Sequence, residues 1–311
     1  MSVSKTSQAV AVTRAGFARP NSRLGDPLAQ RRLCAGMRSV VLTDMQAALA
    51  ARTAFFDGQV TTAIAAGTRQ IVILGAGYDD RALRFRTPDV TFFELDHPDT
   101  QSDKRSRLAA ILAEDGEVPA AGLVSGAPQA ARPRPESARL AEPAGPVLAA
   151  ADFARDDVAG VLAQAGHQAS VPTLFVCEGL LVYLDKPSTV RFLTGVRAAA
   201  APGSVLAASL AIHADGLDSR AVLARANARR RTAAAEPWLT ILPAVAQADL
   251  LARAGWQVTE MFDAADFGTG ADPGRSLLMT ARPAGGSGGS SPRADTAGGS
   301  GGSSPRADTA G

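Results

Sequence analysis

The chain has 311 residues, with 46% hydrophobic and 20% charged residues and a formal net charge of +2. A charge so close to neutral excludes a strongly basic, nucleic-acid-binding chain, so we expect no nucleic-acid partner. No apolar run is long enough to span a bilayer, and the first residues lack the apolar core of a secretory signal. We therefore expect a cytoplasmic protein without a membrane partner. Its two distant cysteines, Cys34 and Cys177, have no metal-type spacing, so we expect free thiols and no bound metal.

The first 67 residues are predicted to form a helical cap. Residues 7–17 have an amphipathic helical pattern, and apolar side chains recur at three- and four-residue steps from Leu28 to Ala66. Gly67 follows directly, in the position where a glycine commonly ends a helix. The cap therefore ends where the apolar pattern changes.

Residues 70–96 have the order of one parallel βαβ unit. An apolar run at 71–74 leads into Gly75-Ala76-Gly77, and a second run at 90–93 leads into Glu94-Leu95-Asp96. Glycine lets the backbone turn sharply and approach a ligand, because a Cβ there would clash. The final aspartate lies at the carboxyl end of the second strand, where a carboxylate can accept both hydroxyls of a ribose. The unit therefore predicts a nucleoside site.

The residues after the glycine turn indicate which nucleoside is bound. A dinucleotide-binding turn has a third glycine where this chain has Asp80, which Tyr78 and Asp79 precede. Two carboxylates beside a helix N-terminus would repel a pyrophosphate, which prefers bare N–H groups and the positive end of the helix dipole. They suit a ligand that carries an ammonium and a sulfonium group, so the pattern favours S-adenosylmethionine over NAD.

The rest of the chain alternates between strand and helix patterns. Strands are predicted at 147–151, 172–177, 204–211, 256–262 and 276–280, and helices at 98–113, 156–165, 187–201, 220–235 and 244–254. We predict an α/β fold, a Rossmann-like seven-stranded, mostly parallel sheet with helices on both faces, plus the N-terminal helical region. Asp96, Asp152 and Glu178 each end a predicted strand, at the edge where such sheets bind ligands.

The sheet domain is predicted to cover residues 68–283, with two segments set apart by their composition. Residues 113–146 are a Pro/Ala-rich insertion that buries little surface, and residues 214–243 are expected to form an acceptor pocket or lid. From 284 to 311 the unit GGSGGSSPRADTA occurs twice, which predicts a disordered tail. Whether this repeat is natural or added stays open.

Several of these stretches together match one known family. The chain resembles the leucine carboxyl methyltransferase-like branch of the class I S-adenosylmethionine-dependent methyltransferases, which includes protein phosphatase methyltransferases and many bacterial O-methyltransferases. The matching stretches are Thr6–Ala15, Asp26–Ala29, Arg52-Thr53 with Asp57, Gln70–Arg81, Phe93–Asp96 with Pro98 and Lys104, Asp152-Phe153, and Pro172–Leu184. The chain departs from the family at Asp80, where a threonine is usual, and in its longer, more proline-rich insertion.

The resemblance implies S-adenosyl-L-methionine as cofactor and gives individual residues a role. Arg52 would reach the methionine carboxylate and the substrate carboxylate, and Tyr183 would face the substrate. The remaining cofactor contacts that it implies are Gly75, Ala76 and Gly77 at the amino-acid end, Asp96 with Glu94 nearby at the ribose, Asp152 and Phe153 at the adenine, and Glu178 at the methionine ammonium.

The acceptor decides whether a catalytic base is needed. A carboxylate is already ionised at neutral pH, whereas a phenol, with a pKa near 10, would gain from a base. His97 is expected to pack near the cofactor, and His167, in a polar loop, is expected to be solvated. His213, just past the strand at 204–211, is the best-placed candidate base. We assign no catalytic residue.

The predicted function is that of an S-adenosylmethionine-dependent O-methyltransferase. The acceptor is expected to be a carboxylate or hydroxyl of a small, secondary-metabolite molecule such as a polyketide. Three alternatives stay open: a protein C-terminal carboxyl methyltransferase, an NAD-type oxidoreductase, and a non-catalytic nucleoside-binding regulatory protein. The sequence does not specify the acceptor or the oligomeric state.

Overall fold

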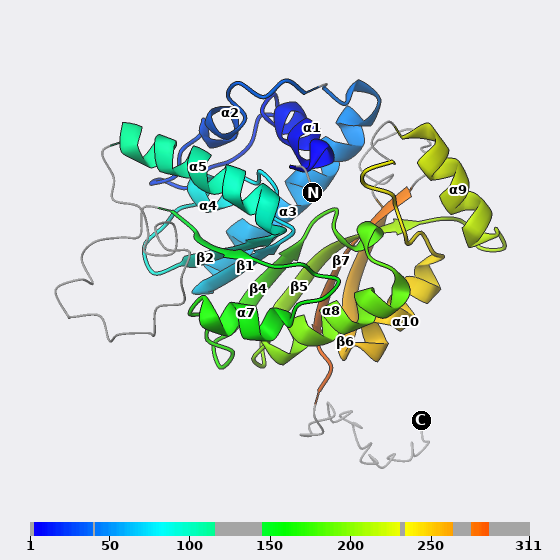
Figure 1. The fold of residues 1–311 in the computed structure, drawn as a ribbon. Helices are drawn as coiled ribbons and strands as arrows, with labels where there is room; N and C mark the ends of the chain where they lie inside the picture. The colour runs from blue at the N-terminus through cyan, green and yellow to red at the C-terminus, as the bar shows by residue number, and fades with distance from the viewer. Residues whose placement is uncertain (1–2, 40, 116–144, 231–233, 264–274, 286–311) are drawn as a thin grey trace, which may run out of the picture.

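A computed structural model describes residues 3–39, 41–115, 145–230, 234–263 and 275–285 (Figure 1). Within these ranges seven strands form one sheet in the order β3-β2-β1-β4-β5-β7-β6. The strands are β1 (Gln70–Leu74), β2 (Thr91–Asp96), β3 (Val147–Ala150), β4 (Thr173–Cys177), β5 (Val205–Ile212), β6 (Trp256–Asp263) and β7 (Arg275–Pro283). The predicted insertion and the repeat tail lie largely outside the described residues.

The predicted α/β sheet is confirmed. Strands β1 to β5 run parallel, and β7 is antiparallel to both β5 and β6, so the sheet is mostly parallel. The central strands β1 and β4 are buried along their whole length, as strands covered on both faces must be. Leu74 at the end of β1 pairs with Leu95 of β2 and Cys177 of β4, so the carboxyl ends of these three strands lie side by side.

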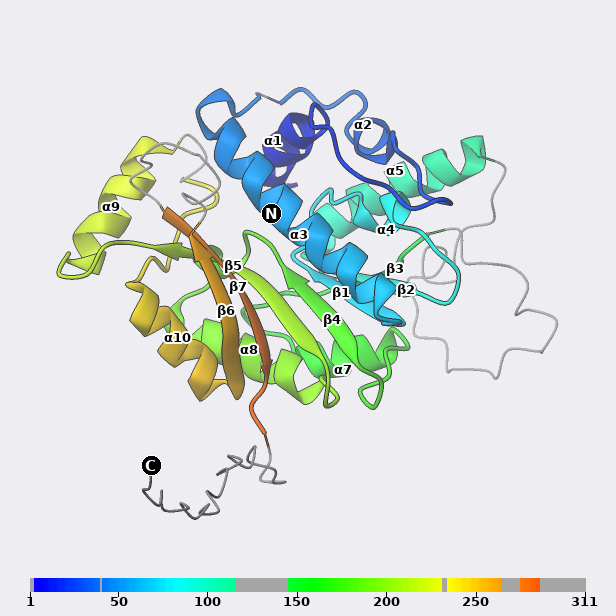
Figure 2. The same cartoon turned by 180° about the vertical axis from the view of Figure 1, so that it is seen from behind.

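Helices cover both faces of the sheet (Figures 1 and 2). One face packs against α3 (Gln46–Ala65) and α4 (Arg81–Arg84), through a core that includes Phe56, Phe85 and Val176. The short β3 edge of this face is covered by α5 (Pro98–Glu114). The other face packs against α7 (Val158–Gln164), α8 (Lys186–Ala198) and α10 (Ala244–Arg253), around Phe192 and Leu251.

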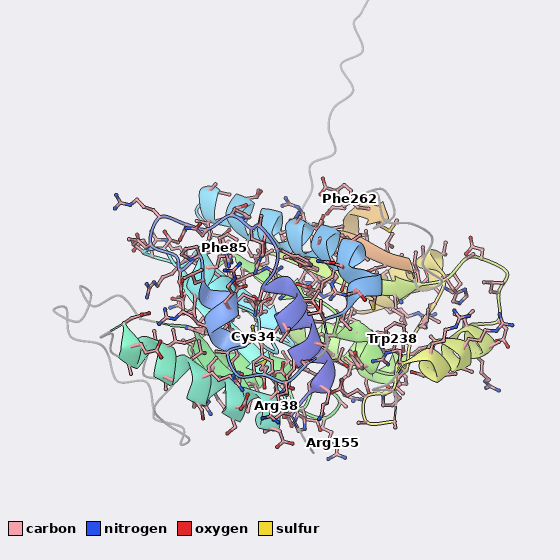
Figure 3. All side chains as sticks on the ribbon, turned by 90° about the horizontal axis from the view of Figure 1, so that it is seen from above. Cys34, Arg38, Phe85, Arg155, Trp238 and Phe262 are labelled. Atoms are coloured by element: carbon pink, nitrogen blue, oxygen red, sulfur yellow. The ribbon has the colours of Figure 1, made fainter. Side chains whose placement is uncertain are left out.

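The N-terminal region crosses the carboxyl edge of the sheet (Figures 1 and 3). It contains α1 (Lys5–Arg14), α2 (Ala29–Leu33) and the short helix η1 (Thr43–Met45), which leads into α3. The helical pattern expected from Leu28 to Ala66 is interrupted between α2 and η1. The chain leaves the helix after α2, where Gly36 adopts a positive φ of 73°, a conformation that a helix does not allow.

The segment after β5 folds back on itself. Helix α9 (Ser219–Arg229) is shorter than the predicted helix at 220–235, because Arg230 already has an extended backbone. The Asn227 side chain then bonds both the N–H and the carbonyl of Trp238, each at 2.9 Å, which fixes the return of the chain beside the helix. None of the helices in the described ranges has the length and apolar character needed to cross a bilayer.

Candidate active site

The turn after β1 is built by two glycines with a left-handed backbone. Gly75 and Gly77 have φ values of 68° and 50°. A Cβ added to Gly75 would lie 3.1 Å from the Leu180 side chain, and one added to Gly77 would lie 2.9 Å from Ser7. The turn is therefore closely packed on two sides, and a side chain at either position would both strain the backbone and displace a neighbour.

The acids predicted at the strand ends occupy one edge of the sheet. Asp96 ends β2, Asp152 follows β3, and Glu178 follows β4, on strands that are neighbours of β1 or of each other. Phe92 and Val176 belong to the core on the α3 side, and side chains alternate along a strand. Asp96 and Glu178 therefore point to that same side, on either flank of the glycine turn.

Asp96 is tied directly to the glycine turn. Its Oδ2 accepts the Gly77 N–H at 2.5 Å, and its Oδ1 accepts the His97 N–H at 2.6 Å. Burial raises the pKa of the Asp96 carboxyl, while these two N–H groups oppose the shift. Each carboxylate oxygen keeps a second lone pair, so a ligand hydroxyl can be accepted in addition.

Glu94 lies two residues before Asp96, on the same face of β2, and has a different environment. It is 1% exposed, and its Oε2 lies 2.5 Å from Nζ of Lys104, which also donates to the Asp79 carbonyl at 2.7 Å. Burial raises the pKa of Glu94 to about 7, against the opposing charge of Lys104. The structure places Glu94 in a buried pair beneath Asp96, and its role toward a cofactor stays a prediction.

The two residues predicted to flank an adenine have separate environments. Asp152 is half-buried, and its Oδ1 accepts the Ala154 N–H at 3.0 Å, which shapes the turn after β3. The ring of Phe153 is buried on the opposite face of the sheet and meets Phe192 edge-to-face, with centroids 5.1 Å apart. The Asp152 carboxylate is thus the more accessible of the two side chains.

Glu178 is held by three arginines from three parts of the chain. Arg14 of α1 approaches its carboxylate to 2.5 Å, Arg52 of α3 to 2.9 Å, and Arg81 of α4 to 2.7 Å. Burial alone would raise the pKa of Glu178, but the charges of the three arginines outweigh burial and lower it. The Arg52 side chain is 18% exposed, more than those of Arg14 and Arg81.

The acids after the glycine turn are part of the same network. Asp79 pairs with Arg81 at 2.5 Å, and Asp80 pairs with Arg19 at 2.5 Å and with Arg84 at 2.7 Å. Both acids are buried. Their charges are therefore neutralised by arginines inside the protein. The expectation that these two carboxylates would repel a pyrophosphate is wrong.

Four arginines of the network were not among the predicted site residues: Arg14, Arg19, Arg81 and Arg84. The DDRALR stretch carried one signal, because Asp80 and Arg84 lie four residues apart at a short helix, the spacing at which opposite charges pair. For Arg14 and Arg19 no local signal existed, since their acidic partners are remote in sequence.

An aromatic and cationic cluster forms the side of the site near α9. Tyr183, in the short helix η3 (Leu181–Tyr183), receives a hydrogen bond from Arg230 at 3.2 Å. The Arg230 guanidinium lies over the Tyr183 ring and over the Trp238 ring, at 5.6 and 4.4 Å from their centroids. Figure 3 shows Trp238 between α1 and α9. The predicted substrate-facing tyrosine is thus joined to the predicted acceptor segment.

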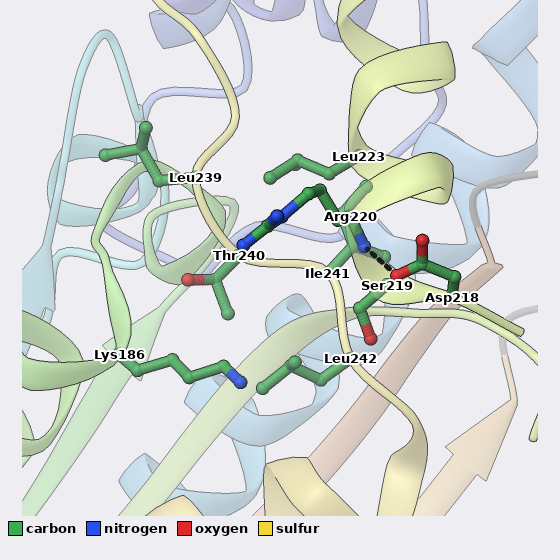
Figure 4. Close-up of a pocket in the computed structure, with 9 residues that line it drawn as sticks. All are labelled: Lys186, Asp218, Ser219, Arg220, Leu223, Leu239, Thr240, Ile241 and Leu242. Atoms are coloured by element: carbon green, nitrogen blue, oxygen red, sulfur yellow. Dashed lines mark hydrogen bonds between the residues drawn. The ribbon is translucent and has the colours of Figure 1, made fainter.

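A pocket of about 390 Å³ opens at the base of α9 (Figure 4). Apart from Lys186 at the start of α8, its lining comes from within the segment predicted to form the acceptor pocket. These lining residues are Asp218, Ser219, Arg220, Leu223, Leu239, Thr240, Ile241 and Leu242.

His213 lies behind this pocket with both ring nitrogens engaged. Nδ1 is 2.7 Å from the Ala214 carbonyl, which can only accept, so Nδ1 carries the proton. Nε2 then accepts the Ser219 hydroxyl at 2.7 Å. In this arrangement His213 fixes the start of α9, and its role as a base stays a prediction.

The other two histidines make contacts that stabilise the fold. The expected solvation of His167 is wrong, because its ring is buried against Phe93 and Phe175 and its Nε2 bonds Thr173 at 3.0 Å. His97 caps the start of α5. Across the described ranges, no group of three His, Cys, Asp or Glu side chains is arranged to hold a metal ion.

The chain is similar to the proteins of one family. A model of the leucine carboxyl methyltransferase family matches residues 10–197. A Mycobacterium avium (strain 104) protein named "Putative S-adenosyl-L-methionine-dependent methyltransferase" is 36% identical over 188 residues, 60% of this chain and 51% of that protein. A Parafrankia sp. (strain EAN1pec) protein of the same description is 36% identical over 220 residues, 66% of this chain and 62% of that protein. The chain thus spans between half and two thirds of the length of these relatives.

A solved structure supports the fold alone. The crystal structure of a protein titled a "putative methyltransferase" from Thermobifida fusca YX superposes with a TM-score of 0.51 at 16% sequence identity. The match covers 89% of this chain and 94% of that one. The similarity therefore extends over nearly all of the sheet and its helices.

Proposed function

The chain belongs to the leucine carboxyl methyltransferase family, whose cofactor is S-adenosyl-L-methionine, and from this premise we propose that it is an O-methyltransferase. The proposed acceptor is a carboxylate or hydroxyl of a small, secondary-metabolite molecule. The name of the family, which specifies a carboxyl group, favours the carboxylate. The same name keeps a protein C-terminal carboxylate as the second candidate acceptor.

One observation carries the proposal: the glycine turn after β1 is flanked by Asp96 and by the Glu178 cluster on one side of the sheet edge. A nucleoside that carries an amino acid needs a hydroxyl acceptor at one end and charged partners at the other. Asp96, with free lone pairs next to Gly77, fits the ribose end. The half-buried Asp152 on the next strand fits the adenine amino group. The residues present therefore fit the cofactor.

The Glu178 cluster fits the amino-acid end because it contains both signs of charge. Arg52, the most exposed of the three arginines there, can pair with the methionine carboxylate, and Glu178 can accept from the ammonium. The backbone of Gly179 adjoins this guanidinium, since a Cβ at Gly179 would lie 3.9 Å from Nη2 of Arg52. The cluster therefore offers an ion pair for each charge of an amino acid.

The protein's task in methyl transfer is positioning. When bound, S-adenosylmethionine would supply an activated methyl group, whose bond to sulfur would break as the bond to the acceptor oxygen formed, leaving S-adenosylhomocysteine. The proposed task of the chain is to hold the two reactants in line and to keep water away from them. For a carboxylate acceptor no proton has to be removed, and the Tyr183 hydroxyl with the Arg230 guanidinium supplies partners that orient it.

Calorimetry with three ligands tests the assignment. S-adenosylmethionine and S-adenosylhomocysteine are expected to bind, and NAD is not. Formation of S-adenosylhomocysteine is then measured over a panel of carboxylic acids, phenols and peptides with free C-termini. Binding of NAD instead would support the oxidoreductase alternative. Cofactor binding with no product from any acceptor class would support a regulatory protein.

Arg52→Ala is expected to weaken S-adenosylmethionine binding about tenfold to a hundredfold, because one charge-assisted pair to the carboxylate is lost. Arg14 and Arg81 still hold Glu178, so the fold should be kept. The dissociation constant is measured by calorimetry, with Arg225→Ala, at an exposed position of α9, as the matched control. An affinity equal to that of the control would remove Arg52 from the cofactor site.

A further inference from the structure

The start of α1 receives a carboxylate from a distant segment. Glu236 accepts the backbone N–H of Lys5 at 2.9 Å through Oε1 and that of Thr6 at 3.2 Å through Oε2. The first N–H groups of a helix have no partner within the helix, and a negative charge there is favourable to the helix dipole. One side chain thus satisfies two donors across more than two hundred residues of chain.

The same end of α1 lies on the glycine turn. The Ser7 side chain packs so closely on Gly77 that an added Cβ would come within 2.9 Å of it. The Ser4 N–H also approaches the Thr100 hydroxyl of α5 at 3.4 Å. The first turn of α1 therefore covers the part of the turn from which Gly77 donates to Asp96.

Glu236 itself is anchored on the acceptor side. Arg230 donates to the Glu236 carbonyl at 3.0 Å while it lies over the Trp238 ring. Three residues after Glu236, the Leu239 N–H donates to the Val182 carbonyl at 2.7 Å, next to Tyr183. The carboxylate that holds α1 therefore stands on the segment that contacts Tyr183.

We propose that Glu236 is a positioning residue that clamps α1 over the cofactor and joins this cover to residues 236–239, the acceptor-side segment. The inference rests on the proposed function, since it takes the glycine turn as the cofactor's seat. Release of S-adenosylhomocysteine then requires the two hydrogen bonds to Glu236 to break. The conformation of the acceptor-side segment therefore sets the rate at which the cofactor is exchanged. A bound acceptor that contacts this segment would hold the cofactor in place.

Two variants remove the clamp from opposite sides. Glu236→Ala removes both acceptors. Lys5→Pro removes one donor, and proline is tolerated there because Lys5 is the first helical residue and Ser4 has the extended backbone that precedes a proline. Lys5→Ala keeps the backbone N–H and is the matched control. Dissociation of S-adenosylhomocysteine is followed by stopped-flow fluorescence, and hydrogen exchange is measured over residues 3–15.

Both clamp variants are expected to release S-adenosylhomocysteine at least about tenfold faster than the wild type, as a lost charge-assisted pair implies, and Lys5→Ala is expected to match the wild type. Amide exchange at the start of α1 should rise in the same two variants. Unchanged release in Glu236→Ala and Lys5→Pro would overturn the clamp. If the wild type bound no S-adenosylhomocysteine, the proposed function would be wrong, and so would the proposed effect of Glu236 on cofactor release. Amide hydrogen exchange in α1 would still show whether Glu236 holds the helix.

Discussion

Arg81→Leu is expected to lower the melting temperature by about 10 °C. The Arg81 side chain is fully buried, and it donates to Asp57 at 2.8 Å, to Asp79 at 2.5 Å and to Glu178 at 2.7 Å. Leucine replaces the volume but leaves three buried carboxylates short of a partner. Breaking a buried ion pair in this way costs about 3–5 kcal/mol of unfolding free energy. At ~2–4 °C per kcal/mol for a domain of this size class, the loss is large and measurable by calorimetry.

The pH dependence of this loss identifies its cause. The pKa of Glu178 is lowered in the folded protein, so its contribution to stability is present above its unfolded pKa and disappears as the pH falls through and below that value. The difference between Arg81→Leu and the wild type should therefore be greatest near pH 7 and shrink in acid. Arg225→Leu, at an exposed position, should leave the melting temperature unchanged. A loss in Arg81→Leu that is constant with pH would mean that packing, and not charge, is responsible.

Asp96→Ala is expected to abolish measurable S-adenosylmethionine binding. Two charge-assisted bonds to the ribose hydroxyls would be lost, at ~1.5–3 kcal/mol each, which corresponds to at least about a hundredfold in affinity. The N–H groups of Gly77 and His97 also lose their acceptor, so the glycine turn itself loosens. Calorimetric titration with S-adenosylmethionine measures the affinity.

Two comparisons separate recognition from folding for Asp96. Near-ultraviolet circular dichroism establishes that Asp96→Ala is folded, and Asp249→Ala removes an equal charge from an exposed position of α10. Asp96→Asn keeps one acceptor for the turn, so it should fold at least as well as the alanine variant and still bind poorly. Wild-type affinity in both Asp96 variants, with the turn intact, would exclude this carboxylate from the ribose contact.

The fold could be predicted from the sequence because its signals are local. The run at 71–74 is buried on both faces, and the glycines that follow it need a positive φ, so strand and turn are each specified by a few neighbouring residues. The same holds for Asp96, which ends the next strand. The ends of the elements were predicted less accurately. The helix expected to reach residue 235 ends at Arg229, because the hydrogen bonds between the Asn227 side chain and Trp238 favour a return of the chain.

The charge network could not be predicted because its partners are remote in the sequence. Asp79 and Asp80 beside a glycine turn look like ligand-facing acids until Arg14 and Arg19 are known to reach them. Similarly, Glu94 and Asp96 share a face of β2. Only the position of Lys104 on α5 shows that Glu94 forms a buried ion pair, whereas Asp96 lies at the edge of the sheet. Such distinctions depend on packing between elements, which no local pattern encodes.

The contact between Arg14 and Glu178 has a consequence for the order of assembly. The two residues are separated by 164 positions, and each contributes a charge that the other needs. During synthesis this ion pair cannot form until Glu178, which follows β4, has been added to the chain. Helix α1 therefore lacks its counter-charge while β1 to β4 are synthesised. Because contacts between remote residues form slowly, we expect cofactor-binding competence to arise late in folding.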